Sequence, residues 1–262
     1  MRILVTNDDG VASEGLHAIA ASLAADGHDV VVVAPSSDLS GSGSSLGTLE
    51  DGARVGCRPV ELPELPAIPV WSVDAPPAFA VLATASGLFG ERPDLVVSGI
   101  NPGPNTGRMI LGSSTVGAVL TATAIGLRGV ALSCGFPPDH RFDTAARVGV
   151  AVIDWFAEHP VYDALNVNVP DCDLADIHGV RMAPLARRGL MGLRLEHEPD
   201  AIVLSRYTQN SRLGEDTDSD LLSRGYVAVS ALRNLGTVGE DDEAGLAAAL
   251  EAELAAALAA AG

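Results

Sequence analysis

The chain has 262 residues, 47% of them hydrophobic and 19% charged, which excludes an intrinsically disordered protein and is enough for one large globular core. Its net charge is −18, and all 16 of its basic residues are arginine. Such an acidic protein is a poor partner for nucleic acid, and an anionic ligand would need a local metal ion or arginine to offset the negative field.

The three cysteines, Cys57, Cys134 and Cys172, are far apart in the sequence and form no C-x-x-C pair. This pattern predicts buried thiols in a reducing compartment, not a disulfide framework or a zinc site. No basic segment followed by an apolar one opens the sequence, and no run of about eighteen apolar residues is long enough to cross a bilayer. We therefore expect a cytoplasmic protein without a membrane partner.

The first predicted strand, residues 3–5, runs into two adjacent carboxylates and a glycine, Asp8, Asp9 and Gly10. A helix is predicted behind them over residues 13–26. The aspartates therefore lie where a first strand ends and its crossover begins. In open α/β sheets this is where ligands bind.

Adjacent carboxylates raise one another's pKa unless a cation lies between them. A divalent ion removes this repulsion, and oxygen ligands of this kind favour Mg²⁺ or Mn²⁺. Asp8 and Asp9 are therefore candidate metal ligands. The alternative is structural: both aspartates only form a turn and cap the following helix, with Gly10 in a left-handed conformation.

The second strand is predicted over residues 29–34, a β-branched run typical of a strand buried on both faces. After Pro35 comes a segment rich in serine and glycine, residues 36–47, which fits neither strand nor helix. If this loop leaves the same sheet edge as the aspartates, its hydroxyls and N–H groups could ligate a metal ion or bind a phosphate. The alternative is a flexible surface linker.

An extended excursion with four prolines follows, and the chain returns at a strand over residues 70–73. Residues 78–89 are predicted to be helical, with Pro76 and Pro77 at the start. The next strand, residues 93–101, again ends in small and polar residues. It repeats the pattern of the first strand.

A stiff turn with two glycines and two prolines, residues 102–107, can hold Asn101 and Asn105 in fixed positions. The amide oxygen of Asn101 would be a neutral ligand for the hard cation predicted at Asp8 and Asp9. The alternative is that Asn101 only bonds its own backbone in the turn.

Ser113, Ser114 and Thr115 open a helix predicted over residues 115–125, whose first N–H groups could receive an anion. Capping of the helix by these hydroxyls is the alternative. Beyond it, strands are predicted over residues 130–133 and 164–169. Between them lies a helix over residues 143–159, with Val148, Val152, Trp155 and Phe156 at core spacing.

From residue 180 the pattern changes to separated extended pieces, 180–184, 201–207 and 225–232, which can form a hairpin or antiparallel edge strands. The acidic residues 214–220 are predicted to be solvated surface before a helix that begins near Leu221.

The last predicted helix, residues 240–262, has one apolar stripe and would pack on the body or on a second subunit. Its stripe is made of Leu246, Leu250, Leu254 and Leu258.

Taken together, motifs along most of the chain resemble the SurE (survival protein) family of metal-dependent nucleotidases. The set is specific, although each motif alone is weak. The matching segments are residues 7–10, 34–35 with 40–41, 98–105, 166–170, and 216–218 with 225–229.

This resemblance implies an α/β, Rossmann-like fold: a mostly parallel sheet flanked by helices, with a projecting β-hairpin and a C-terminal helix. It implies a catalytic core over residues 1–180 and an oligomerisation region over residues 181–262, whose hairpin and helix are exchanged in a homodimer or homotetramer. The implied activity is that of a 5′/3′-nucleotidase, which releases phosphate from nucleoside monophosphates, with polyphosphate as a further substrate.

The resemblance also implies a ligand set for one divalent metal ion per subunit, Mg²⁺ or Mn²⁺: Asp8, Asp9, Ser40 and Asn101. Of these, Asp8, Asp9 and Asn101 would act in catalysis, while Asn105 and Ser113 would lie beside the phosphate. Charge on the phosphoryl oxygens would be met near Ser40, Gly41 and the helix opened by Ser114 and Thr115. A metal ion with open positions can activate water, so no covalent nucleophile is required.

The chain departs from the family pattern in two places. Ala75 and Ala78 stand where the family usually has threonine and aspartate, and Ser114 and Thr121 replace a glycine and a glutamate. A metal-dependent nucleotide- or phosphate-binding protein with weak or lost catalysis is therefore the alternative. An NAD-binding Rossmann protein is disfavoured because the first turn lacks G-x-G-x-x-G.

Overall fold

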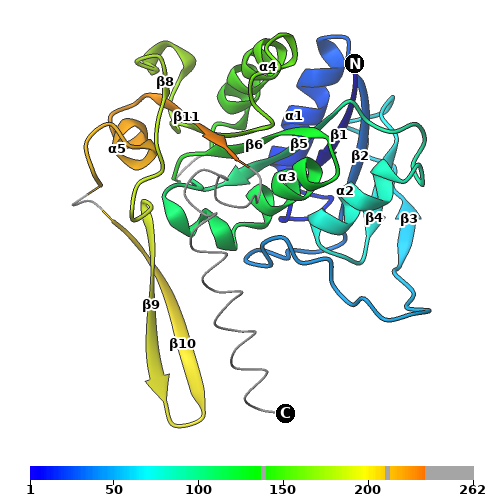
Figure 1. Cartoon of the computed structure of the whole chain (residues 1–262), viewed down its shortest axis with the longest axis horizontal. Coiled ribbons are helices and arrows are strands. Elements are labelled where there is room, and N and C mark those ends of the chain that lie inside the picture. The colour runs from blue at the N-terminus through cyan, green and yellow to red at the C-terminus, as the bar shows by residue number, and fades with distance from the viewer. Residues whose placement is uncertain (137–139, 210–212, 234–262) are drawn as a thin grey trace, which may run out of the picture.

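The computed structural model describes residues 1–136, 140–209 and 213–233. Its centre is a nine-stranded sheet in the order β3-β4-β2-β1-β5-β6-β7-β11-β8 (Figure 1). Six neighbouring strands run parallel: β4 (Val70–Val73), β2 (Asp29–Pro35), β1 (Arg2–Thr6), β5 (Leu95–Pro102), β6 (Arg128–Cys134) and β7 (Ala164–Val169). Numbered along the chain, these six have the 3-2-1-4-5-6 order of the Rossmann fold, so the predicted Rossmann-like α/β fold is confirmed.

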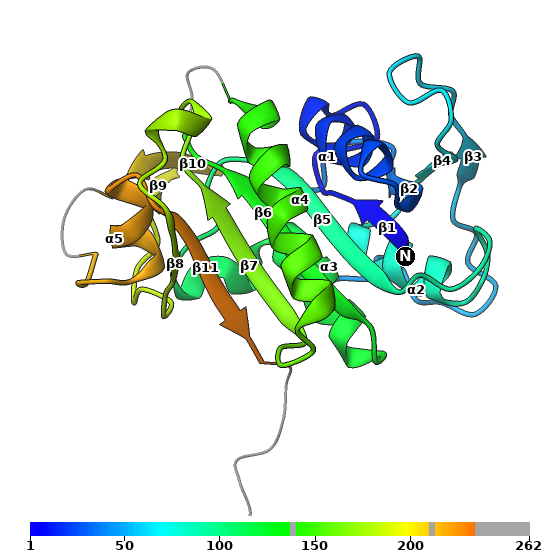
Figure 2. The ribbon, with the colours of Figure 1, turned by 90° about the horizontal axis from the view of Figure 1, so that it is seen from above.

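Helices cover both faces of the sheet. α1 (Glu14–Ala25) packs with α4 (Phe142–Glu158) on one face, and α2 (Pro77–Ala85) with α3 (Ser114–Ala124) on the other (Figure 2). Ile3 and Val5 of β1 join the core beneath α1 and α4, whereas Leu4 joins the core beneath α2 and α3. Because both faces are buried, the parallel strands are nearly continuous apolar runs, which makes them recognisable in the sequence.

Short and antiparallel strands complete the sheet at its edges. β3 (Cys57–Pro59) pairs with β4, and β11 (Val227–Leu232) pairs antiparallel with β7 and parallel with β8 (Val180–Met182). The 3-10 helices η1 (Arg108–Gly112) and η2 (Leu174–Asp176) and the helix α5 (Asp218–Ser223) lie in the connections. The main sheet therefore continues past residue 180, and the division into regions 1–180 and 181–262 stays a prediction.

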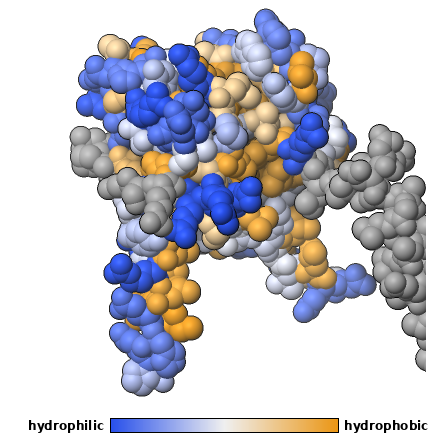
Figure 3. Space-filling view, turned by 60° about the vertical axis from the view of Figure 1, so that its left-hand side comes forward, coloured by the Kyte–Doolittle hydropathy of each residue, from blue (hydrophilic) through white to orange (hydrophobic). Residues whose placement is uncertain are grey.

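β9 (Met191–Glu198) and β10 (Ala201–Thr208) form the projecting hairpin that the resemblance implies (Figure 1). The sequence pattern predicts β10 but not β9, whose apolar residues alternate with charged ones. Apolar side chains on the hairpin are exposed and form a stripe beside charged groups (Figure 3). They are Leu193, Leu195, Ile202, Val203, Leu204 and Tyr207.

Two predictions about helices are wrong in detail. α2 ends at Ala85 and not at Phe89, because Gly87, with φ at +84°, turns the chain so that the Leu88 N–H reaches the Ala83 carbonyl at 3.2 Å. In α4, Trp155 is 45% exposed and not part of the core. The side of α4 that packs on the sheet is the adjacent stripe, made of Ala145, Gly149, Ile153 and Phe156. The predicted stripe of Val148, Val152 and Trp155 lies beside it.

The prediction of three buried thiols holds only for Cys134. Cys57 is exposed because β3 is an edge strand whose residues are all exposed, and Cys172 is half-buried. The acidic segment 214–220 is also not wholly solvated, since Asp218 is fully buried. The helix predicted over residues 240–262 lies outside the described residues.

Candidate functional site

The predicted carboxylates lie at the point where the strand order reverses. β1 ends just before Asp8 and Asp9, and its two neighbours are β2, which leads outward to β4, and β5, which leads outward to β6. Asn101 lies near the carboxyl end of β5. In open α/β sheets a crevice forms here because adjacent connections pass to opposite faces, so this is where a ligand is expected.

Asp8 and Asn101 meet at one hydroxyl group. Thr115, in the first turn of α3, donates its hydroxyl hydrogen to Asp8 Oδ1 at 2.7 Å, and its Oγ1 lies 3.4 Å from Asn101 Oδ1. Asp8 is 3% exposed and Thr115 fully buried. Burial raises the pKa of Asp8, and the bond from Thr115 partly offsets this rise. The first turn of α3 therefore sets the position of the first carboxylate.

Asp9 is the least satisfied group of the site. Its Oδ2 is buried and has no hydrogen-bond partner among the described residues. Burial, and then the nearby charges of Asp8 and Asp38, raise the pKa of Asp9 from 3.8 to about 7. A half-buried carboxylate with one unpartnered buried oxygen, beside a second carboxylate, fits a bound cation, which would remove both costs at once.

Neither aspartate caps α1, so the capping part of the structural alternative is wrong, whereas Gly10 does have the positive φ that it expects, at +101°. The N-cap position is Ser13, and no side chain caps there. The bond that closes the turn comes from Asn7, whose Nδ2 donates to the Gly10 carbonyl at 3.2 Å. The carboxylates of Asp8 and Asp9 therefore neither close this turn nor cap the helix.

Asn101 makes the turn bond of the structural alternative, and its role as a metal ligand stays a prediction. Its Nδ2 donates to the Gly103 carbonyl at 2.6 Å, which is the turn bond of the structural alternative. That bond fixes the amide plane and directs Oδ1 toward Thr115 and Asp8. The turn bond therefore orients the oxygen that could serve as a neutral ligand.

The loop after β2 is attached to the site, so the linker alternative is wrong for residues 39–43. Leu39 N–H donates to the Asp8 carbonyl at 2.8 Å, and Ser114 Oγ donates to the Leu39 carbonyl while accepting from Ser42 N–H at 2.9 Å. The loop also lies directly on α3: a Cβ on Gly117 would be 2.3 Å from the carbonyl oxygen of Gly43.

Ser40 is exposed, and it binds a carboxylate that the motif analysis does not single out. Its N–H donates to Asp38 Oδ1 at 2.8 Å, and together with a bond from the Ser40 side chain this holds the pKa of Asp38 below its ordinary value. Arg206 of β10 adds to the lowering, so the base of the hairpin brings a positive charge toward this loop. The signal for Asp38 in the sequence is that it is the one acid in a Ser/Gly segment.

Asn105 is held by a polar network at the ends of β6 and β7. Its carbonyl accepts from the Nδ2 atoms of Asn166 and Asn168 at 2.9 Å each, its N–H donates to Asn168 Oδ1, and its Nδ2 donates to Ser133 Oγ at 3.0 Å. Ser113 accepts the Val116 N–H at 3.2 Å and is the N-cap of α3, as the capping alternative expects. Asn105 is therefore fixed near the strand ends, and the hydroxyl oxygen of Ser113 accepts the capping bond of α3.

Asp218 is a structural carboxylate that the sequence analysis places on the surface. Its Oδ2 accepts the Gly107 N–H at 2.7 Å and its Oδ1 accepts the Ala186 N–H at 2.8 Å. It thereby joins the turn after Asn105 to the segment that leads into the hairpin. Its position in the first turn of α5, directly after the N-cap Thr217, is the available signal.

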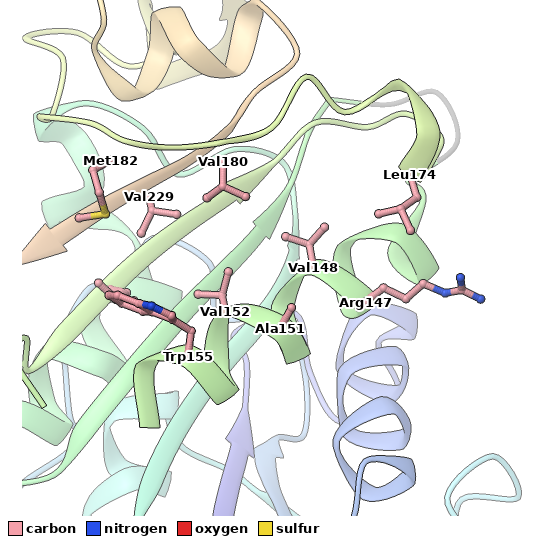
Figure 4. A pocket seen from close by; sticks show the side chains of 10 residues that line it. Arg147, Val148, Ala151, Val152, Trp155, Leu174, Val180, Met182 and Val229 are labelled. Atoms are coloured by element: carbon pink, nitrogen blue, oxygen red, sulfur yellow. The ribbon is translucent and has the colours of Figure 1, made fainter. Parts of the chain in front are cut away.

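A pocket of about 570 Å³ lies away from these carboxylates, between α4 and the strands β7, β8 and β11 (Figure 4). Trp155, Val152 and Met182 are among its lining residues, and Arg147 contributes the one charged side chain to the lining. Because it offers no carboxylate or hydroxyl, this pocket has no chemistry for a metal ion or a phosphate. The candidate site is the polar one at the carboxyl edge of the sheet.

Residues 3–191 match a model of the survival protein SurE family. The chain belongs to the SurE family. Its SurE relatives include the 5′-nucleotidase SurE of Desulfatibacillum aliphaticivorans, 40% identical over 195 residues that cover 74% of each chain. The 5′-nucleotidase SurE of Trichormus variabilis is 36% identical over 192 residues, which cover 72% of this chain and 70% of that one.

The SurE protein of Aquifex aeolicus, known from a crystal structure, resembles the whole architecture. The two share a TM-score of 0.76 and 29% identity, over 90% of this chain and 95% of that one. No helix among the described residues is long and apolar enough to cross a membrane.

The residues that depart from the SurE motifs lie in helices or just before them. Ala78 is fully buried in α2, and Ala75 is 4% exposed. Thr121 donates its hydroxyl hydrogen to the Gly117 carbonyl at 2.8 Å within α3. These positions therefore offer no free polar group to a ligand.

Proposed function

We propose that this protein is a metal-dependent phosphomonoesterase, a 5′/3′-nucleotidase that hydrolyses nucleoside monophosphates to nucleosides and phosphate. The observation that carries the proposal is the buried Oδ2 of Asp9, which has no hydrogen-bond partner in the described ranges of the chain, beside Asp8 at the topological switch point. Membership of the SurE family and the name 5′-nucleotidase carried by relatives at 36–40% identity support it. The substrate is then a small molecule, and nucleic acid is disfavoured by the net charge of −18.

The residues that would hold one Mg²⁺ or Mn²⁺ ion per subunit are Asp8, Asp9, Asn101 and Ser40. Two carboxylates, an amide oxygen and a hydroxyl are hard ligands, and a site built this way keeps positions open. Bound there, the ion would supply a Lewis acid for a phosphate oxygen and lower the pKa of a water molecule. The Ser40 hydroxyl bonds Asp38, so it would have to turn toward the ion to serve as a ligand.

The chain's own groups position the reactants. Thr115 fixes Asp8, the Gly103 carbonyl fixes Asn101, and Ser114 holds the loop that contains Ser40 and Gly41. The first turn of α3 directs the positive end of its dipole toward Asp8, where it favours an anion such as a phosphate. The phosphate would lie between this turn and Asn105, whose network of asparagines keeps it in place.

The direct test is a phosphate-release assay over nucleoside 5′- and 3′-monophosphates and polyphosphate. Purified protein with Mg²⁺ or Mn²⁺ should release phosphate, EDTA should abolish the release, and added metal should restore it. Full activity after complete chelation would overturn the metal-dependent mechanism. The assay would also identify the preferred metal and the preferred phosphate position.

A second candidate is a metal-dependent nucleotide- or phosphate-binding protein with weak or lost catalysis. The observation in its favour is that Ala75, Ala78 and Thr121 offer no free polar group where the family usually has threonine, aspartate and glutamate. Calorimetry that shows metal-dependent nucleotide binding, together with no turnover above background, would favour this function over the enzyme.

For the assembly we propose a homodimer or homotetramer in which the hairpin β9–β10 contacts a second copy of the chain. The support is the exposed apolar stripe on the hairpin, because a two-stranded hairpin with exposed leucines is not stable without a covering surface. A cytoplasmic location stays a prediction.

A further inference from the structure

A thiol, an imidazole and a carboxylate meet beyond the end of β6, outside the candidate active site. Cys134 is the last residue of β6, His140 precedes α4, and Asp171 follows β7. One ligand atom from each lies within 4.8 Å of the other two. Cys134 faces the core beneath α1 and α4, whereas its neighbour Ser133 faces Asn105, since successive residues of a strand point to opposite faces.

The spacing of two of these groups suits a tetrahedral ion. Cys134 Sγ lies 3.6 Å from Asp171 Oδ1. With a Zn–S distance of about 2.3 Å and a Zn–O distance of about 2.1 Å, two ligands at the tetrahedral angle are about 3.6 Å apart. The sulfur and the oxygen therefore already have the separation that Zn²⁺ requires, and a ring nitrogen of His140 lies within 4.8 Å of both.

Asp171 is oriented by the segment that carries His140. Its Oδ2 accepts the His140 N–H at 3.1 Å, and its Oδ1 accepts the Arg141 N–H at 2.6 Å. Oδ1 also accepts a weak hydrogen bond from the Cys134 thiol. A carboxylate has about four acceptor positions, so Oδ2 keeps a lone pair for a cation, and Oδ1 regains one when the thiol loses its proton. The carboxylate is thus fixed in place without being saturated.

His140 has an unsatisfied ring. Its Nδ1 is buried and has no hydrogen-bond partner within the described part of the chain, and the ring stacks on Phe142 at a centroid distance of 5.5 Å. A buried polar atom without a partner costs free energy, which binding an ion in this cluster would offset. Thiolate, imidazole and carboxylate together are a ligand set for zinc, unlike the all-oxygen set around Asp8 and Asp9.

A nucleophilic Cys–His–Asp arrangement does not fit this cluster. The Cys134 side chain is fully buried, and burial, with the charge of Asp171 next, raises the pKa of its thiol to about 12. A reactive cysteine needs access and a lowered pKa. The other potential ligand group, Asp26, His28 and Asp154, has no thiol and lies partly in solvent, so it is an ordinary surface contact.

We infer that Cys134, His140 and Asp171 form a zinc site with a water molecule in the fourth position. When Zn²⁺ binds, the S–H bond of Cys134 breaks, the proton leaves to solvent, and the sulfur electron pair binds the ion. The ion joins the end of β6, the start of α4 and the segment after β7. This site is separate from the nucleotidase proposal and does not depend on it.

The test uses the full-length chain, freed of metal by a chelator, with Asp9→Asn in all samples to weaken binding at the other site. Added Co²⁺ should produce a thiolate-to-cobalt absorption in the near ultraviolet that Zn²⁺ displaces. Cys134→Ser should abolish this absorption. His140→Ala should weaken Zn²⁺ binding by about tenfold or more, since loss of even an outer-shell partner has an effect of that size.

Cys172→Ser and His28→Gln are matched controls, because each removes the same chemical group from outside the cluster; both should keep the absorption and the Zn²⁺ affinity. Circular dichroism checks that each variant folds. If Cys134→Ser does not fold, the Zn²⁺ affinity of His140→Ala tests the inference instead. The His140 side chain is partly exposed, so its loss should not prevent folding. Unchanged Zn²⁺ affinity in His140→Ala, or an absorption lost in Cys172→Ser and kept in Cys134→Ser, would overturn the inference.

Discussion

The switch point has fewer hydrogen-bond donors than its three acceptor oxygens need. The three are Asp8 Oδ1, Asn101 Oδ1 and Asp9 Oδ2. Thr115 has one hydroxyl hydrogen, which goes to Asp8 at 2.7 Å and leaves Asn101 Oδ1 at 3.4 Å without a full bond. Asp9 Oδ2 has no partner among the described residues. In a buried setting, oxygens left in this way are costly unless a ligand uses them, so the deficit itself indicates where the ligand binds.

Replacing Asp9 with asparagine separates the metal-binding role from a merely structural one. Asp9→Asn preserves the shape and removes one anionic ligand, so metal affinity and turnover should fall by about a hundredfold or more, since outer-shell changes alone cost about 10- to 100-fold. Isothermal calorimetry and phosphate release measure the two quantities. Asp51→Asn, in an exposed turn, should behave like the parent; an Asp9→Asn protein with parental turnover would refute the assignment.

The raised pKa of Asp9 predicts a pH dependence of stability in the metal-free protein. The pKa is about 7 in the folded protein against 3.8 for the ordinary group. Between these values the folded state holds a proton that the unfolded state has lost, so the free energy of unfolding falls as pH rises through this window. Urea denaturation in EDTA, at about pH 4 and about pH 7, should show that Asp9→Asn loses less stability than the parent. Equal losses would contradict a protonated Asp9.

At the scale of elements, the first turn of α3 organises the site. Thr115 bonds Asp8, Ser114 bonds the loop at Leu39 and Ser42, and Gly117 lets the loop lie against the helix. The loop after β2, the helix α3 and the end of β1 are therefore one packed unit. A change in α3 should alter the position of the Asp8 carboxylate.

Thr115→Val tests this unit. The valine has the same shape but no donor for Asp8, so metal affinity should fall by about tenfold. Thr121→Val on the same helix is the matched control, because its hydroxyl bonds only the Gly117 carbonyl; its metal affinity should equal that of the parent. Calorimetry with Mn²⁺ measures both, and equal affinities of the two variants would show that α3 does not position Asp8.

Asp218→Asn tests the connection between the turn after Asn105 and the base of the hairpin. The variant places an N–H₂ group opposite the N–H of Gly107 or Ala186, so the free energy of unfolding should fall by about 1–3 kcal/mol. Glu215→Gln, in the same acidic segment but exposed, should change it by less than about 0.5 kcal/mol. Urea denaturation measures both; a neutral Asp218→Asn would mean that these bonds do not stabilise the fold.

At the scale of the whole molecule, the hairpin exposes apolar side chains that the described residues do not bury. Leu195 and Leu204 lie directly opposite one another and are 64% and 54% exposed. A surface of this kind favours contact with another chain, and the net charge of −18 opposes non-specific association. Contact through the hairpin then has to be specific.

Leu195→Arg should shift the proposed oligomer toward the monomer, because a charge in an apolar interface costs free energy when it is desolvated. Light scattering coupled to size-exclusion chromatography measures the mass. Leu88→Arg adds the same charge at a leucine that is 69% exposed and far from the hairpin, and it should leave the mass unchanged. If both variants keep the parental mass, the hairpin is not the interface.

Local sequence determined those features whose signal is itself local. The β-branched run of β2 identifies a strand buried on both faces. Asp8 and Asp9 come just after β1, and Asn101 lies near the end of β5, so their placement at one sheet edge is predictable from the α/β pattern. Apolar periodicity predicts only β10 of the hairpin, because leucines alternate with charged residues in β9. The resemblance to the SurE motifs predicts the whole hairpin.

Tertiary structure alone decided what depends on contacts between distant residues. Periodicity places Trp155 on an apolar stripe of α4 but cannot tell which of two adjacent stripes meets the sheet. In the sequence, Asp218 is one of several acidic residues in an acidic segment. In the structure it accepts the N–H groups of Gly107 and Ala186, which are 111 and 32 residues away. His140 is near Cys134 in the sequence, but Asp171 reaches them only because β6 and β7 end side by side. Burial and coordination are properties of the neighbours that folding brings together, and a single local stretch does not contain them.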